Sequence, residues 1–230
     1  SNYIFTGNSS TKNIDIQLFT YNEEECVENK IMLLDSIPTF EKNKKNYWLN
    51  IHGLNNPENI ASICEQQGIH NLVIQDILDV NQRPKFQEFE HFSFLTLKSI
   101  VPSEKNIITE QISFVFGTNF LLSFQERNAD FFDHLRYRLR ESKGKLRERG
   151  ADYLLYAMLE STLDNYFKTI NKLDEEVEKL NFSDTTKEPS PNALAIIEGH
   201  KKFVHYIKKS ILPIKEFTQI VERGDCNYIE

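Results

Sequence analysis

The sequence has little of what several classes of protein require. It contains only three cysteines, which lie far apart and form no C-x-x-C pair, so neither a disulfide framework nor a zinc ribbon is expected and a reducing compartment fits best. The longest uninterrupted apolar run, residues 153–159, is about a third of the roughly 20 residues that a membrane helix needs. No basic region followed by an apolar one opens the chain, so no secretory signal is visible.

Signatures of common enzymes are also absent from the sequence. It has no glycine-rich phosphate loop, no H-E-x-x-H, no G-x-S-x-G and no EF-hand loop. The net charge of −7, from 27 basic and 34 acidic side chains, is unfavourable for binding a phosphate backbone. The basic run at residues 136–149 is interpreted as the solvated face of a helix and turn. We therefore expect no enzyme and no nucleic-acid partner; a cation or a basic surface is the expected partner.

What the chain does have is enough apolar content for a core, at 40% of 230 residues, and two kinds of periodicity. Apolar residues alternate with polar ones in several short segments, which is typical of half-buried strands. Asn56-Pro57 and Gly68 are typical of a helix start and stop. We predict strands at 14–18, 47–51, 92–97, 112–116 and 120–124 and helices at about 57–67 and 71–78. Interleaved in this way, they indicate an α/β fold with a mixed parallel and antiparallel sheet.

The second half of the chain has helical periodicity instead. Apolar residues repeat with spacings of three and four over 152–180, which predicts one helix extending over roughly 40 Å. A turn-rich break at 181–191 separates it from a second apolar pattern over 197–221, so a long antiparallel helix hairpin is expected. Pro213 should kink or break its second helix. We predict a division into an α/β domain at 1–150 and the hairpin at 151–230.

Two carboxylates are candidate metal ligands. Asp76 and Asp79 are three residues apart on the second short helix, so both can face the same way. Oxygen ligands are what Mg²⁺ prefers, and one or two carboxylates with retained waters are its usual protein environment. From this spacing alone, the two residues are interpreted as ordinary surface acids.

A series of short motifs changes that interpretation, because together and in order they resemble the CorA family of magnesium and cobalt channels. The motifs are Trp48-x-Asn50-Ile51-x-Gly53, Gly68-Ile69-His70-x-Leu72, Asp76-Ile77-Leu78, Gln82-Arg83-Pro84-Lys85, Glu110-Gln111-Ile112-Ser113, Ser123-Phe124-Gln125-Glu126, Ala151-Asp152-Tyr153-Leu154-Leu155-Tyr156 and Asp164-Asn165-Tyr166-Phe167. They cover nearly the whole chain.

The resemblance implies an α/β/α sandwich followed by the helix hairpin, from the N-terminal, cytoplasmic portion of a protein in the cell inner membrane. The family's stalk helix and two membrane spans would then be missing, and we expect the chain to be an excised piece. The family's full-length proteins are homopentamers with a Gly-Met-Asn signature at the pore mouth. Both methionines of this sequence, Met32 and Met158, are followed by leucine, so the pore element is not among these residues.

By position, Asp76 matches the family's regulatory metal-binding aspartate, whose partner carboxylate lies on the neighbouring subunit's stalk helix. Glu160 matches a position at which an acid can contribute to a second metal site. Gln75 and Asn81 depart from the family pattern at that second site. The resemblance thus implies a domain that senses Mg²⁺, or another divalent cation such as Co²⁺, and favours the closed channel when the ion binds between subunits. The candidate metal ligands are Asp76, Asp79 and Glu160.

Two alternatives stay open at the level of the sequence. One is the cytoplasmic domain of a zinc transporter of the ZntB-like branch. Gln75 and Asn81 keep this alternative open, because they depart from the pattern of the magnesium and cobalt channels. The other is a free-standing soluble protein that senses metals or binds a partner.

Overall fold

A computed structural model describes residues 3–7, 14–42, 44–101, 108–126, 131–180 and 190–229. One seven-stranded sheet has the order β2-β1-β3-β7-β6-β5-β4, and β3 pairs with β7 in parallel while the other neighbours are antiparallel. The sheet is therefore mixed, as predicted. Its strands are β1 (Asp15–Tyr21), β2 (Cys26–Lys30), β3 (Asn46–His52), β4 (Lys85–Glu88), β5 (Ser93–Val101), β6 (Ile108–Phe116) and β7 (Phe120–Gln125).

Two helices cover one face of the sheet. In α1 (Pro57–Gln66), the Asn56 carboxamide oxygen accepts a hydrogen bond from the Asn59 backbone N–H at 3.1 Å, and proline occupies the first turn. The chain then turns at Gly68, whose φ of 71° lies in the region that favours glycine, and enters α2 (Asn71–Leu78). The buried side of both helices packs against strand residues in one cluster, which includes Ile60, Ile63, Val73, Ile74, Ile77, Leu49, Ile51, Phe94, Leu122 and Phe124.

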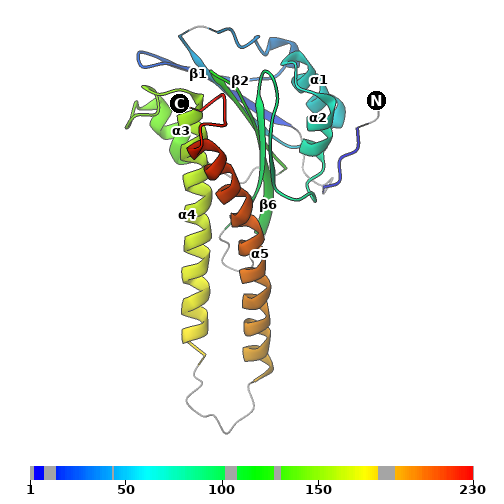
Figure 1. Cartoon of the computed structure of the whole chain (residues 1–230), viewed down its shortest axis with the longest axis vertical. Coiled ribbons are helices and arrows are strands. Elements are labelled where there is room, and N and C mark those ends of the chain that lie inside the picture. The colour runs from blue at the N-terminus through cyan, green and yellow to red at the C-terminus, as the bar shows by residue number, and fades with distance from the viewer. Residues whose placement is uncertain are drawn as a thin grey trace.

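Three helices cover the opposite face, which completes the α/β/α sandwich (Figure 1). They are α3 (Asp133–Arg140), α4 (Ala151–Glu178) and α5 (Pro191–Glu222), and a short 3₁₀ turn, η1 (Leu34–Ser36), precedes β3. The core on this side joins strands and all three helices, and it includes Trp48, Phe114, Phe116, Leu135, Leu154, Met158, Phe203, Ile214 and Phe217. The division of the chain at residue 150 stays a prediction.

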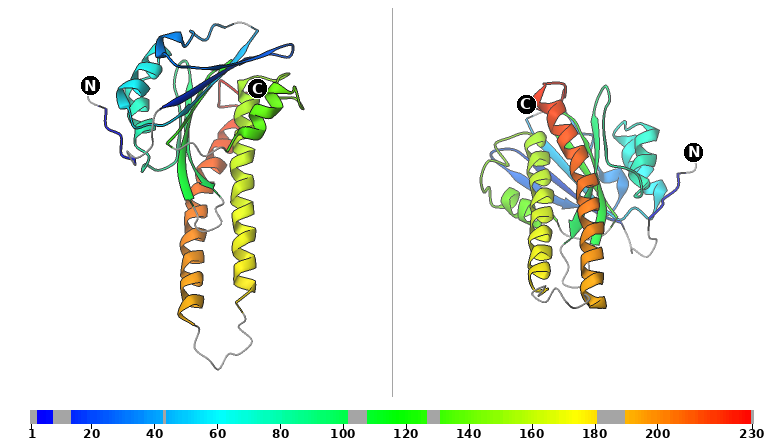
Figure 2. Two further views of the ribbon diagram at one scale, coloured as in Figure 1. Left: turned by 180° about the vertical axis from the view of Figure 1, so that it is seen from behind. Right: turned by 60° about the horizontal axis from the view of Figure 1, so that its bottom comes forward.

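The distal halves of α4 and α5 extend beyond the sheet as an antiparallel hairpin (Figures 1 and 2). One ring nitrogen of His200 lies 2.7 Å from the carbonyl oxygen of Leu173 on α4, and the other lies 2.6 Å from that of Ile196 on α5. The predicted break at 181–191 falls mostly outside the described residues. Pro213 lies inside α5, which continues through this proline as one helix. The C-terminal part of α5 is tilted relative to its N-terminal part (Figure 1).

One residue of the basic run at 136–149 is buried, whereas the other lysines and arginines of the run are exposed or half-buried. Arg136 is only 3% exposed, and its guanidinium lies 5.6 Å from the centre of the Trp48 ring and donates to the Gln17 carboxamide oxygen at 3.0 Å. The interpretation of this run as a solvated face is therefore wrong at Arg136. The helical spacing of α3 turns this arginine toward the sheet, where its stem packs on the aromatic core.

His134 on α3 provides a test of the packing of α3 against α4. Its Nε2 lies 2.7 Å from the Ser161 hydroxyl, and burial, followed by the Arg138 and Lys168 charges, lowers the pKa of the imidazole; Asp133 and Asp164 oppose this shift. As the pH falls below the ordinary histidine pKa of about 6.5, the unfolded chain takes up this proton before the folded chain does, so stability falls.

We expect urea unfolding of the wild type between pH 7.5 and 5 to show a steeper loss of stability than unfolding of the variant His134→Gln. The matched control is His91→Gln, since the side chain of His91 is 83% exposed. Identical pH profiles for the wild type and His134→Gln would contradict this assignment.

Candidate metal site

Asp76 lies on α2, and its carboxylate forms an ion pair with the ammonium group of a lysine on β4. Its Oδ2 atom is 2.6 Å from Nζ of Lys85, which opens β4, and the two side chains are 23% and 33% exposed, respectively. The Gln82 carboxamide donates to the Asp76 backbone carbonyl and fixes the turn between α2 and β4. Asp76 is therefore accessible from solvent, and an ammonium group already neutralises its charge.

Asp79 is engaged differently, although it is only three residues away. Its Oδ1 atom accepts hydrogen bonds from the Thr6 hydroxyl at 2.9 Å and from the Asn81 backbone N–H at 3.2 Å. The Gln111 carboxamide donates to its backbone carbonyl at 3.2 Å. The Asp79 side chain thus ties residues 3–7 to the end of α2, and one of its carboxylate oxygens has two donors within the chain.

Glu160 is exposed on α4 and therefore lies on the other side of the sheet from α2. Within the described part of the chain, no group of three or more His, Cys, Asp or Glu side chains is close enough together to bind a metal ion. Asp76 thus lies on α2, whereas Asp79, predicted to lie on the same helix, is the residue just after its end, with φ of −88° and ψ of 86°; Glu160 is not brought to either of them. The three residues stay predicted ligands.

The departures at Gln75 and Asn81 have a visible structural role. The Gln75 carboxamide donates to the Ile4 carbonyl at 3.0 Å and accepts from the Ile4 N–H at 3.4 Å, as a neighbouring strand would. Asn81 donates to the Thr6 carbonyl at 3.3 Å. These amides dock residues 3–7 beside the candidate ligands, an arrangement that no periodicity in the sequence indicates.

A polar cavity of about 390 Å³ opens beside Asp79, between the end of α2, strands β5 and β6, and α5. Lys98 reaches into it, and its ammonium donates to the Val80 carbonyl at 2.5 Å and to the Gln111 carboxamide oxygen at 3.2 Å. Burial lowers the pKa of Lys98, whereas the charges of Asp79 and Glu126 act in the opposite direction. The lysine therefore gives this cavity, which Glu110 and Glu126 also line, a mixed charge.

Comparison with known families decides what kind of protein carries this site. The family described as CorA-like Mg²⁺ transporter protein matches residues 43–230. The chain belongs to the CorA family. No described helix of this CorA-family chain is long and apolar enough to cross a bilayer.

Individual relatives agree with this membership. The cobalt/magnesium transport protein CorA of Thermotoga maritima is 32% identical over 230 residues, which are 99% of this chain and 65% of that protein. The soluble domain of CorA from Methanocaldococcus jannaschii has the same fold, with a TM-score of 0.74 and 20% identity over 95% of this chain and 82% of that one. The cytoplasmic domain of ZntB from Vibrio parahaemolyticus also shares the fold, with a TM-score of 0.69 and 15% identity over 91% of this chain and 84% of that one.

This CorA-family chain therefore spans about two thirds of its Thermotoga relative. Its relatives are named as transporters rather than enzymes, in keeping with the absence of enzyme motifs from the sequence. The family match begins at residue 43 and so includes Asp76, Asp79 and Glu160.

Proposed function

We propose that this CorA-family chain is the cytoplasmic part of a magnesium and cobalt transporter of the inner membrane, and that Asp76 reports internal Mg²⁺ to the pore. The observation that carries this proposal is the position of Asp76: a partly exposed carboxylate within the residues that the family model matches, in an ion pair with Lys85. An ion pair of this exposure contributes little free energy, so another cation can replace the ammonium.

We infer that a second carboxylate comes from a neighbouring subunit, since the residues that the structure describes form no group of three or more possible metal ligands. In the homopentamer that the family resemblance implies, this partner lies on a neighbouring subunit. Two bare carboxylates 4 Å apart repel by roughly 4 kcal/mol at an effective dielectric near 20. A bound Mg²⁺ reverses the sign of that interaction, so the ion draws the two subunits together.

Regulation follows if the ion binds the closed assembly better than the open one. Each site then favours closure by about 1.4 kcal/mol when the ion is near tenfold its dissociation constant, and five sites add to several kcal/mol. A fall in the internal Mg²⁺ concentration would then favour the open channel. Glu160, exposed on the other side of the sheet, would contribute to a second site together with groups that the described residues do not place beside it.

Zinc transport is the second candidate, favoured by the fold that this chain shares with the ZntB domain. Uptake competition among Mg²⁺, Co²⁺ and Zn²⁺ in the parent transporter separates the two functions. Uptake that Zn²⁺ but not Mg²⁺ or Co²⁺ competes for would favour the ZntB-like function.

The role of Asp76 is tested by Asp76→Asn in the parent transporter. We expect uptake to continue at internal Mg²⁺ concentrations that stop the wild type, with half-inhibition shifted upward at least about tenfold, because the amide removes a charged ligand. Asp35→Asn, at an exposed acid in η1, is the matched control and should leave the inhibition unchanged. An unaltered inhibition curve for Asp76→Asn would rule out this residue as the sensor.

A further inference from the structure

His200 lies in the distal half of the hairpin, between α4 and α5. Its Nδ1 atom is 2.6 Å from the carbonyl oxygen of Ile196, one turn earlier on α5, and its Nε2 atom is 2.7 Å from the carbonyl oxygen of Leu173 on α4. Both distances lie at the short end of the range for N–H···O bonds, where bonds from charged donors are found. Each ring nitrogen of His200 therefore faces an oxygen that can only accept a hydrogen bond.

These two carbonyl oxygens determine which form of the imidazole fits between the helices. The neutral ring has one N–H group, and its other nitrogen is an acceptor, so that nitrogen would face a carbonyl oxygen with no proton between them. Turning the ring over does not help, because it brings C–H groups to both oxygens at distances well below the roughly 3.3–3.6 Å of a C–H···O contact. The imidazolium donates at both nitrogens, so it is the form that satisfies both bonds.

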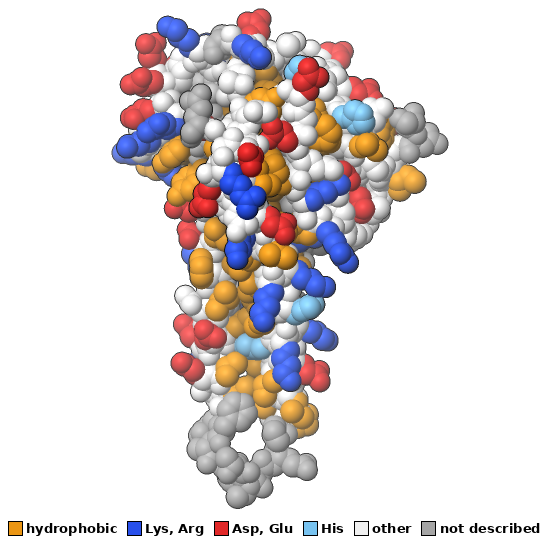
Figure 3. Space-filling model, viewed as in Figure 1, with side chains coloured by type: hydrophobic (Ala, Val, Ile, Leu, Met, Phe, Trp, Pro, Cys, Tyr) orange, Lys and Arg blue, Asp and Glu red, His pale blue; other side chains and the backbone are white. Residues whose placement is uncertain are grey.

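The two halves of the hairpin are held together differently. In the half nearer the sheet, Tyr166 of α4 and Phe203 of α5 are buried, with exposed fractions of 1% and 5%. In the distal half, Ile170 and Leu173, which lie where α4 faces α5, are only partly buried. Figure 3 shows hydrophobic side chains between the two helices and charged ones on the outer sides of the hairpin. The bond from His200 to Leu173 therefore joins the helices where less apolar surface is buried.

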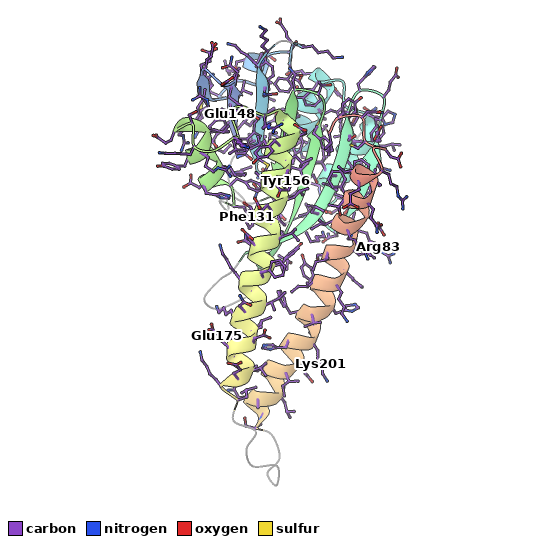
Figure 4. The ribbon with its side chains drawn as sticks, turned by 60° about the vertical axis from the view of Figure 1, so that its left-hand side comes forward. Arg83, Phe131, Glu148, Tyr156, Glu175 and Lys201 are labelled. Carbon is purple, nitrogen blue, oxygen red and sulfur yellow. The ribbon has the colours of Figure 1, made fainter. Side chains whose placement is uncertain are left out.

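Charged side chains of both helices surround this bond. Within four residues of Leu173 or His200, the described chain carries the four acids Asp174, Glu175, Glu176 and Glu198 and the three bases Lys172, Lys201 and Lys202. Figure 4 shows Glu175 on α4 and Lys201 on α5, on opposite sides of the hairpin. Because acids and bases nearly balance, the two carbonyl oxygens are the groups that select the charged form of the ring.

We propose that His200 is a pH-sensitive clamp, which as the imidazolium holds the distal halves of α4 and α5 together. As the pH rises through the range in which histidines lose their second proton, the neutral ring keeps one of its two hydrogen bonds and gives up the other. Stability that depends on this bound proton is present at low pH and lost as the pH rises. The distal hairpin therefore loosens at high pH, while the half that packs on the sheet stays closed. This switch does not depend on a metal at Asp76.

Hydrogen exchange of the 230-residue chain in buffer with EDTA measures the loosening, as protection factors corrected for the intrinsic exchange rate. From about pH 5.5 to about pH 8.5, protection of residues 170–178 and 192–202 should fall at least about tenfold relative to residues 151–165 and 206–222. The loss of the hydrogen bond causes this fall, since a short helix without tertiary contacts is marginally stable in water. The lowered pKa of His134 changes stability with pH in the opposite direction, so His134 does not produce this result.

The variant His200→Gln separates the contact from its titration. A carboxamide donates a hydrogen bond at every pH, so protection of the distal hairpin should be the same at both pH values. The matched control is His205→Gln, at an exposed histidine further along α5, which should keep the pH dependence of the wild type. Wild-type protection that does not change with pH, or a pH dependence that persists in His200→Gln, would overturn the proposal.

Nitrogen-15 NMR of the histidine side chains gives a second measurement, which uses the wild type and does not depend on the folding of a variant. At about pH 5.5, both ring nitrogens of His200 should carry a proton, and raising the pH should remove one of them as the distal hairpin loses protection. A single protonated nitrogen on His200 at the acid end of this range would rule out the clamp.

Discussion

Replacing Trp48 with alanine is expected to lower the free energy of unfolding by about 3–5 kcal/mol. The indole is fully buried on β3, stacks on Phe19 with ring centres 5.0 Å apart, and lies under the Arg136 guanidinium. Its Nε1–H donates to the Ser123 hydroxyl on β7 at 2.9 Å. Alanine would therefore leave a large cavity in the core that joins the sheet to α3 and α4.

Urea unfolding followed by far-UV circular dichroism measures this loss, since Trp48 is the single tryptophan of the chain and its fluorescence would disappear. Trp48→Phe is the graded control. It keeps an aromatic ring, and the Ser123 hydroxyl retains its hydrogen bond to Asn50 at 2.8 Å, so the cost should be clearly smaller than for alanine. A loss below about 1 kcal/mol for Trp48→Ala would mean that this side chain does not anchor the core.

The sequence pattern predicted the buried part of the sheet and the long helices well. Strands β1, β3, β5, β6 and β7 overlap the five predicted strands, although β1 and β6 are longer than predicted, and α4 and α5 overlap the two helical patterns. The edge strands were missed for a physical reason. In β2, four of five side chains are exposed, so its sequence shows no alternation of apolar and polar residues that would indicate its pairing with β1. The short β4 pairs only with β5 and has little buried surface.

The surroundings of the candidate site were less predictable than the fold. Asp76 stood out through the family resemblance, whereas its spacing to Asp79 indicated only surface acids. Nothing in the sequence indicates that Lys85 returns to Asp76, because this depends on how the chain turns after α2. Likewise, Gln75 and Asn81 look like lost ligands in the sequence, and only the structure shows them docking residues 3–7.

The ion pair with Lys85 leads to a second large expected effect: Lys85→Glu should tighten Mg²⁺ binding to the chain by about 10- to 100-fold. The wild-type ammonium lies 2.6 Å from the Asp76 carboxylate, so an incoming cation must displace it. Glutamate removes this competitor and places a second carboxylate beside the first, and added ligand charge raises the affinity for a divalent ion. Isothermal titration of metal-free protein with Mg²⁺ measures the change.

The same substitution should make the stability of the chain depend on Mg²⁺. Without the ion, the introduced carboxylate repels that of Asp76 and the melting temperature falls; with the ion in excess, binding to the folded state recovers it. Lys85→Met separates the two causes, because it removes the competing charge without adding a ligand, and its Mg²⁺ affinity should lie between those of the wild type and Lys85→Glu. If Lys85→Glu binds Mg²⁺ no better than the wild type, the Asp76 carboxylate is not positioned to take part in a cation site, and its ion pair with Lys85 serves only to attach β4 to α2.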